Sequence, residues 1–247
     1  MIITCESVSY SYRGRRRALN DFTARLGPGV VGLLGPNGAG KSTLMALIAT
    51  TRSPQSGRIS VGKHDVSDAA SIRRQLGFLP QGFAVMPLET VRRTVEYAAW
   101  ARGIDRSESA EAAERAMEQA GISDRAGERV RTLSGGYRQR LGLACALAGN
   151  PAFVLLDEPT AGIDPVQRTM YRKLVAELGE TRTVVLSTHM LEDVAVLGSQ
   201  VVVMYEGRCA FTGNAEELAS IGADDTSRHR SALEAGYEIS LRRDALG

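Results

Sequence analysis

The chain has 247 residues, 43% of them hydrophobic, and a formal net charge of +2. This length is enough to bury a large core, as one domain or two associated ones. The small charge gives no electrostatic case for nucleic acid or an acidic partner. Cys5, Cys145 and Cys209 have no metal or redox spacing, which favours a reducing compartment. We see no signal peptide at the N-terminus, and the most apolar stretch, Leu141–Gly149, is too short to span a bilayer.

Residues 2–26 alternate loosely between apolar and polar side chains, which predicts two strands around a basic turn, Arg13–Arg17. We expect this arginine run to be a solvated loop and not a phosphate contact. Tyr12 stands just before the basic stretch. Beside a phosphate site its ring is suited to stacking on a purine face, although its position fits a strand-core tyrosine equally well.

The segment Gly35–Thr43, GPNGAGKST, fits the Gly-x-x-x-x-Gly-Lys-Ser/Thr pattern of a phosphate-binding loop. A short buried strand, Val30–Leu34, is predicted before it and a helix, Ser42–Thr50, after it, a context that a plain glycine-rich turn does not explain. Glycines let backbone N–H groups approach phosphate oxygens, and the helix N-terminus adds a partial positive charge. Lys41 is placed to reach the β- and γ-phosphates, and the Ser42 hydroxyl to ligate Mg²⁺. The residues expected around the phosphates are Gly35, Pro36, Asn37, Gly38, Ala39, Gly40, Lys41, Ser42 and Thr43.

Further along, Gly57–Val66 is predicted as a short strand and turn, and Leu76–Leu79 as a strand that leads to Gln81. A glutamine at a strand end is usually a surface residue, but beside a phosphate site it can ligate Mg²⁺ or orient the attacking water. The following residues are rich in Ala, Glu and Arg with helical spacing. We expect an inserted all-α subdomain at about residues 82–150, with Trp100 in its core or facing a partner helix.

Ser134, Gly135 and Gly136 stand just before a predicted helix, Arg138–Ala148. They form a second Ser/Gly-rich helix entrance, which is suited to an anion. A plain N-cap explains the serine, but it explains less well why two glycines follow.

An apolar strand, Phe153–Leu156, ends in two adjacent carboxylates, Asp157 and Glu158. In P-loop enzymes an Asp at such a strand end holds Mg²⁺ through its shell, and a Glu beside it can polarise the attacking water. A random acidic pair is a poorer explanation downstream of a phosphate loop. Another buried strand, within residues 183–190, carries His189 at its end. A lone histidine is ordinarily a surface or satisfied core residue, but at this edge of a doubly wound sheet it can touch the γ-phosphate.

The remaining segments continue the α/β pattern. A helix is predicted from Pro165, after the N-cap Asp164. A hairpin is predicted within residues 201–212, and one short helix within residues 215–219. Residues 221–247 are expected to form a short tail.

Together these features resemble the ATP-binding subunit of ABC transporters, over roughly residues 2–220. The segments that carry the resemblance are GPNGAGKST (Walker A), LPQ (Q-loop), LSGGYRQR (the family signature), VLLDEP (Walker B), AGIDP (D-loop) and STH (H-loop). Their order and spacing agree with the family, which is far more specific than any one motif. Tyr137 stands where the signature usually has glutamine, a variant similar to sequences of the ABC-2 type exporter branch.

The resemblance implies an α/β fold: a P-loop NTPase core with an N-terminal antiparallel β subdomain and an inserted all-α subdomain, in one domain over residues 1–220. It implies binding of ATP and Mg²⁺, with Tyr12 stacked on adenine and Ser42, Gln81 and Asp157 at the metal. It makes Glu158 the general base, His189 the γ-phosphate sensor and Gln81 the link to a transmembrane partner.

The resemblance also implies partners. Two such chains, identical or closely related, would pack head to tail, and Ser134, Gly135 and Gly136 of each would close the phosphate loop of the other. The pair would serve a multi-helix transmembrane permease at the cytoplasmic face of the cell membrane, with export favoured. Cargo is not predicted.

The main rival is an ABC-type ATPase without a transport role. Chromosome and repair versions carry a long coiled coil or zinc module, whereas the insertion here is short and without heptads or Cys pairs. Translation factors of the family carry two cassettes, and this chain has one. A role in cofactor assembly or cell division stays open. A small P-loop kinase or GTPase does not explain LSGG and STH together.

Overall fold

The computed structural model describes residues 1–13, 17–223 and 231–245, so most of the expected basic turn lies outside the described residues. The chain folds around a six-stranded sheet with the strand order β10-β9-β3-β8-β7-β6. Neighbouring strands are parallel except for the antiparallel pair β9–β10. Its strands are β3 (Gly29–Leu34), β6 (Leu76–Leu79), β7 (Phe153–Asp157), β8 (Thr183–Thr188), β9 (Gln200–Tyr205) and β10 (Arg208–Gly213). Strands β7 and β8 are buried along their whole length, which explains why the apolar residues at their centres follow one another and do not alternate with polar ones.

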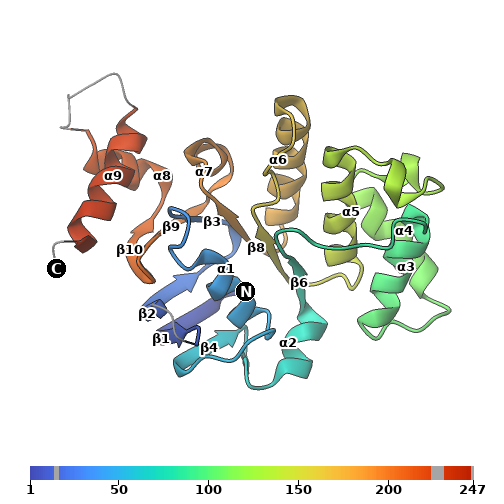
Figure 1. Cartoon of the computed structure of the whole chain (residues 1–247), viewed down its shortest axis with the longest axis horizontal. Coiled ribbons are helices and arrows are strands. Elements are labelled where there is room, and N and C mark those ends of the chain that lie inside the picture. The colour runs from blue at the N-terminus through green and yellow to red at the C-terminus, as the bar shows by residue number, and fades with distance from the viewer. Residues whose placement is uncertain (14–16, 224–230, 246–247) are drawn as a thin grey trace.

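A second, antiparallel sheet has the order β2-β1-β4-β5. Its strands are β1 (Ile3–Ser11), β2 (Arg17–Leu26), β4 (Ser56–Val61) and β5 (His64–Asp65). The helix α1 (Lys41–Ile48) packs with this sheet and with the six-stranded sheet in one hydrophobic core. The short helix α2 (Ala69–Gln75) leads from the antiparallel sheet back to β6. Figure 1 shows this layer below the six-stranded sheet.

Helices dominate between β6 and β7, as the sequence predicted (Figure 1). They are α3 (Val91–Ala101), α4 (Ser109–Gln119) and α5 (Gly135–Leu147), with 3₁₀ turns η1 (Ser123–Arg125) and η2 (Val130–Thr132). Their buried apolar stripes form a second core with β7 and β8. Trp100 is 54% exposed on α3, so the expectation that it lies in the core is wrong.

The last helices are α6 (Pro165–Gly179), α7 (Leu191–Leu197), α8 (Ala215–Ile221) and α9 (Ala232–Ala245). Asp164 caps α6 by accepting a hydrogen bond from the backbone N–H of Gln167 at 3.0 Å, as its sequence position indicated. Helix α9, which the sequence did not lead us to expect, packs against α8, β9 and β10 (Figure 1). Among the described residues, no helix combines the length and the apolar character needed to cross a membrane.

Candidate functional site

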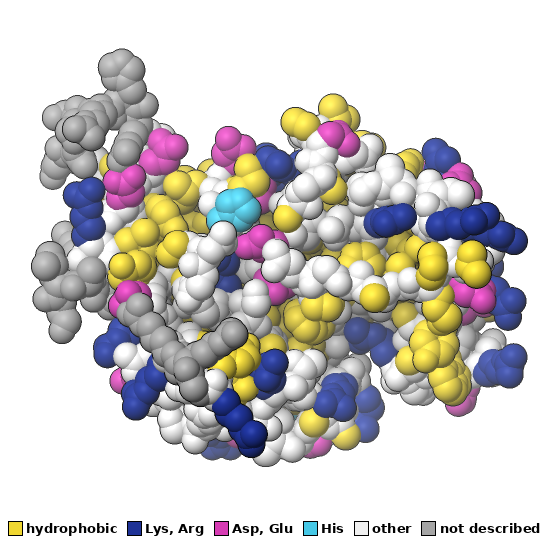
Figure 2. Space-filling model, in the orientation of Figure 1, with side chains coloured by type: hydrophobic (Ala, Val, Ile, Leu, Met, Phe, Trp, Pro, Cys, Tyr) yellow, Lys and Arg dark blue, Asp and Glu magenta, His cyan; other side chains and the backbone are white. Residues whose placement is uncertain are grey.

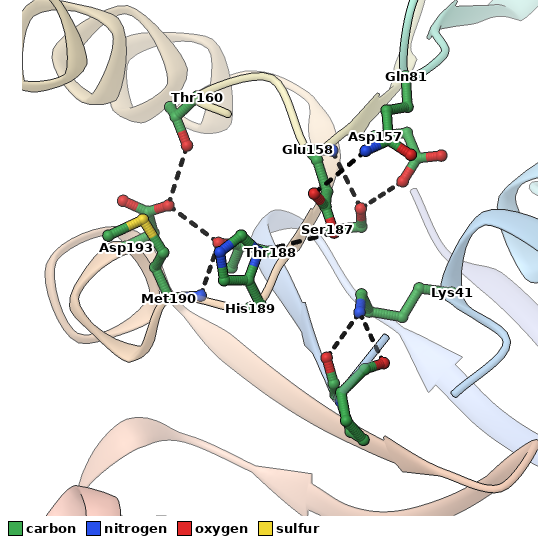
Figure 3. A network of polar contacts seen from close by, with 12 residues as sticks. Lys41, Gln81, Asp157, Glu158, Thr160, Ser187, Thr188, His189, Met190 and Asp193 are labelled. Carbon is green, nitrogen blue, oxygen red and sulfur yellow. Dashed lines mark hydrogen bonds and ion pairs between the residues drawn. The ribbon is translucent and has the colours of Figure 1, made fainter. Parts of the chain in front are cut away.

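The parallel strands β3, β8 and β7 are adjacent, so the loops at their carboxyl ends meet at one edge of the sheet. β3 leads into the loop at residues 35–43, β7 ends at Asp157, and β8 leads to His189. Gln81 follows β6, the next strand. Figure 3 shows that Lys41, Gln81, Asp157, Glu158 and His189 gather there.

The loop after β3 has the backbone that its glycines permit. Gly38 and Gly40 have φ angles of +84° and +106°, in the left-handed region that disfavours other residues. A Cβ at Gly40 would lie 2.4 Å from the carbonyl oxygen of Ala18 and would also meet the Leu19 side chain. Only glycine therefore fits at the start of α1, where the first backbone N–H groups of the helix are free to bind an anion.

Lys41 lies at the centre of this loop and is only 5% exposed. Its Nζ donates to the carbonyl oxygens of Gly35 at 2.6 Å and Pro36 at 3.2 Å. Burial lowers the pKa of the ammonium, and the charges of Glu158 and Asp157 oppose this only in part. No ion pair involving Lys41 occurs among the described residues, so its charge is balanced only by carbonyl dipoles and more distant carboxylates. A triphosphate would supply the missing counter-charge, and the loop therefore fits ATP.

Tyr12 lies beside this loop. Its hydroxyl is 3.2 Å from Thr43 Oγ1 in α1, and its half-buried ring meets Tyr10 edge to face at 5.2 Å. The guanidinium of Arg52 lies 4.9 Å from the ring centroid. The ring therefore stands next to the predicted phosphate loop and not deep inside the strand core.

The two carboxylates at the end of β7 have different environments. Asp157 is 4% exposed and accepts a hydrogen bond from Ser187 Oγ of β8. The backbone N–H of Glu158 donates to Ser187 Oγ at 3.1 Å and to the Ser187 carbonyl oxygen at 3.2 Å. Glu158 has a φ of +47°, a conformation that non-glycine residues adopt at an energetic cost. The Glu158 carboxylate contacts Gln81 and His189, whereas Asp157 is bonded to Ser187.

Glu158 is the meeting point of the predicted catalytic residues. Gln81 Nε2 donates to Glu158 Oε2 at 3.3 Å, and His189 Nδ1 lies 3.7 Å from Glu158 Oε1 (Figure 3). Glu158 and His189 line a cavity of about 130 Å³ that also reaches Thr160 and Arg168. The structure therefore brings together a carboxylate, an imidazole and an amide, and the carboxylate and the imidazole border a space large enough for water.

The donor set also fits Mg²⁺. The Ser42 hydroxyl, the Asp157 carboxylate and the Gln81 amide are hard oxygen donors, which Mg²⁺ prefers and supplements with phosphate oxygens and water. The described residues contain no group of three or more His, Cys, Asp or Glu side chains that would enclose a metal alone. Such a site would depend on the phosphates of a bound nucleotide.

The predicted residues Ser134, Gly135 and Gly136 are not part of this cluster. Ser134 and Gly135 are exposed at the N-terminus of α5, and among the described residues no hydrogen bond joins residues 134–136 to the phosphate loop. Ser134 stands at the N-cap, yet its side chain makes no capping hydrogen bond. A plain N-cap therefore does not account for this serine, and its hydroxyl is open to a ligand.

Comparison with known proteins identifies the family. A family model described as "ABC transporter" matches residues 19–161. The linearmycin resistance ATP-binding protein LnrL of Bacillus subtilis is 31% identical over 228 residues, which cover 91% of this chain and 73% of that protein. The chain belongs to the ATP-binding cassettes of ABC transporters. Cassettes of this family bind ATP and are ATPases, so the predicted family and enzyme class are confirmed.

Other relatives of this cassette differ in their named roles. The methionine import ATP-binding protein MetN of Xanthomonas axonopodis is 33% identical over 247 residues, covering 96% of this chain and 73% of that protein. Rat ATP-binding cassette sub-family A member 7 is 34% identical over 245 residues, or 98% of this chain. The chain spans only 11% of that protein.

The fold comparison agrees with the sequence comparison. The structure resembles the post-hydrolysis dimer of the ATP-binding cassette MJ0796 bound to ADP and phosphate, with a TM-score of 0.76 and 24% identity. The match covers 86% of this cassette and 98% of that one. The predicted α/β P-loop fold is therefore confirmed.

Two residues of the cassette site were not predicted from the sequence. Ser187 bonds both Asp157 and the backbone of Glu158, and Asp193 binds the segments that follow Asp157 and precede His189. In the sequence, these two residues are marked only by a serine inside the run VVLST and by an aspartate four residues after His189. Neither signal has meaning until β7, β8 and α7 are placed side by side.

Proposed function

We propose that this chain hydrolyses ATP and thereby powers a membrane transporter, through ATP-driven head-to-tail dimerisation of two cassettes. The observation that carries the proposal is the position of Glu158, held between Gln81 and His189 at the sheet edge that also presents Lys41. These groups are the ones that phosphoryl transfer to water requires: a base, a phosphate anchor and a polar positioning group.

Each residue has a step in this proposal. Tyr12 stacks on the adenine, and Lys41 together with the backbone N–H groups of the loop holds the phosphates. Mg²⁺, held by Ser42, Gln81 and Asp157 in part through water, neutralises phosphate charge when bound. Glu158 accepts a proton from the water that attacks the γ-phosphate.

His189 completes the step. Its imidazole contacts the γ-phosphate, while Nδ1 faces Glu158 at 3.7 Å. The same imidazole ring then contacts both the Glu158 carboxylate and the γ-phosphate. Loss of the phosphate on hydrolysis would therefore change the contact between His189 and Glu158.

The proposed dimer follows from the position of Ser134, Gly135 and Gly136. They lie apart from the phosphate loop of their own chain and expose an unused hydroxyl and helix N-terminus. A second copy or a close paralogue would place this group on the γ-phosphate. Each ATP would then join two chains, and its hydrolysis would release them.

The proposed transmembrane partner binds beside α3. A groove of about 480 Å³ there is lined by Tyr97 and Trp100, both 54% exposed, and by acidic and basic side chains at its edges. Figure 2 shows hydrophobic side chains gathered on the surface over α3. Met86, five residues after Gln81, also lines the groove, so a partner helix seated there would be linked by a short segment to the glutamine at the site. A partner bound there would hold the chain at the cytoplasmic face of the membrane, which is the location we propose.

Export is the direction we propose. It is supported by the signature variant with Tyr137, which is similar to the ABC-2 type exporter branch, and by the likeness to a resistance protein. The likeness to a methionine import protein points the other way, so direction rests on the signature variant.

The test is Glu158→Gln, which keeps the size of the side chain but removes the proposed base. We expect ATP hydrolysis to fall at least about 100-fold, while ATP still binds and an ATP-bound dimer accumulates in light scattering. Glu177→Gln, an exposed position on α6, is the matched control and should hydrolyse normally. Near-normal hydrolysis by Glu158→Gln would overturn the proposed role.

A further inference from the structure

Asp193 is a buried carboxylate outside every motif described above. It lies near the start of α7, and its side chain is 0% exposed. Arg172 of α6 donates from Nε to Asp193 Oδ1 at 2.6 Å. An isolated buried carboxylate is costly, so it persists only when it is paired and hydrogen-bonded. Arg172 supplies the opposite charge, and two hydroxyl groups donate the remaining hydrogen bonds to the Asp193 carboxylate.

Both hydroxyls reach the same oxygen of Asp193. Thr160 Oγ1 donates to Oδ2 at 3.2 Å, and Thr188 Oγ1 donates to Oδ2 at 3.0 Å. Thr160 comes two residues after Glu158, and Thr188 immediately precedes His189. One carboxylate oxygen therefore binds the segment of the proposed base and the segment of the proposed γ-phosphate sensor (Figure 3).

The contact at Thr188 extends across His189. The Thr188 hydroxyl also accepts a hydrogen bond from the backbone N–H of Met190 at 3.0 Å. The residues on both sides of His189 are thus held by one oxygen atom, whose proton is committed to Asp193. On the other segment, Glu158 has its φ of +47°, which persists only if the surroundings hold it.

We propose that Asp193, paired with Arg172, is a positioning residue for ATP hydrolysis that fixes the Glu158 segment against the His189 segment. The inference rests on the proposed roles of Glu158 and His189. In this proposal, the Thr160 and Thr188 hydroxyls, both bonded to Asp193 Oδ2, set the 3.7 Å separation of His189 Nδ1 and Glu158 Oε1. Because a misplacement of about 1 Å can cost about 100-fold in rate, loosening either hydroxyl should lower turnover while leaving ATP binding intact.

The experiment removes the hydroxyls and leaves Asp193 in place, since replacing the carboxylate would also break its ion pair with Arg172. Thr160→Val and Thr188→Val preserve side-chain shape and delete one donor each. We expect kcat to fall about 10- to 100-fold in each, with KM and the affinity for ATP unchanged. Thr160→Ser and Thr188→Ser retain the hydroxyl and should recover most of the rate.

Thr183→Val is the matched control. Thr183 lies on the same strand as Thr188, is equally buried, and donates its hydroxyl to the carbonyl oxygen of Met1 at 3.0 Å. Its replacement should lower Tm about as much as Thr188→Val but leave kcat unchanged. If Thr188→Val hydrolyses ATP as fast as Thr183→Val, or if serine fails to rescue, Asp193 is merely structural and the inference is overturned.

Glu158→Gln, assayed in parallel, separates the two levels of the proposal. If Glu158→Gln retains hydrolysis, the proposed function itself fails. If it is inactive while the threonine variants behave like Thr183→Val, only the positioning role of Asp193 fails.

Discussion

A single buried ammonium defines the chemistry of the site at the scale of one residue. Lys41 is 5% exposed and satisfied by two loop carbonyls, and burial lowers its pKa. A buried ammonium gains more binding free energy from an anion than an exposed lysine does. The reason is that ion pairing and charge-assisted hydrogen bonds are stronger in a site of low dielectric. The loop is thus suited to binding a phosphate.

Lys41→Ala should lower the affinity for ATP at least about tenfold, the effect of losing one hydrogen bond to a charged group. Titration of nucleotide binding, without hydrolysis, measures it directly. Lys63→Ala is the control, since Lys63 is exposed in the turn between β4 and β5. Unchanged binding in Lys41→Ala would show that the loop is not the phosphate site.

Most of the candidate site residues could be proposed from the sequence because each carries its chemistry in a local pattern. Lys41 and Ser42 were identified from the glycine spacing, and Asp157 and Glu158 from the end of an apolar strand. The sequence left two interpretations of Tyr12 open, because only the folded chain brings its hydroxyl to Thr43. Asp193 was missed altogether, since its partners lie on segments 5 to 33 residues away.

At the scale of elements, the close packing of the C-terminal helices α8 and α9 could not be predicted from the sequence. The apolar residues Leu233, Tyr237 and Leu241 recur with helical spacing and pack on the small core around Leu218. Gly236 interrupts this stripe and is a poor residue for a helix interior. The structure gives its reason: a Cβ at Gly236 would lie 1.8 Å from the carbonyl oxygen of Leu218.

Gly236→Ala should therefore separate α9 from α8, although alanine is the better helix former. The clash is with backbone, which side-chain rotation does not relieve, so we expect a loss of about 1–3 kcal/mol and a Tm decrease of several degrees. Thermal unfolding measures it. Gly127→Ala, where the added Cβ meets no atom within 4 Å, is the control. Equal Tm values for the two variants would contradict the packing argument.

In the proposed mechanism, the molecule as a whole carries two half-sites that lie apart from each other. The phosphate loop, Glu158 and His189 lie at the carboxyl edge of the sheet, whereas Ser134, Gly135 and Gly136 lie on the helical part of the chain. Gly136 packs against Gln167 of α6 so closely that a Cβ added to this glycine would lie 2.9 Å from Gln167 Cγ. The signature is therefore anchored within its own chain. We therefore propose that the signature of a second molecule completes the phosphate site, and that the signature of the same chain does not.

Complementation between two defective chains tests this directly. Lys41→Ala removes the phosphate anchor, and Ser134→Glu places a negative charge against the γ-phosphate while favouring the N-terminus of α5. Each variant alone should be nearly inactive. Mixed in equal amounts, half of the dimers are heterodimers with one intact loop facing one intact signature, which restores about a quarter of the wild-type rate if subunits pair at random. Lys41→Ala mixed with the double variant, which has no intact loop, should stay inactive. If the first mixture also stays inactive although the variants dimerise, each chain closes its own site and the head-to-tail arrangement is wrong.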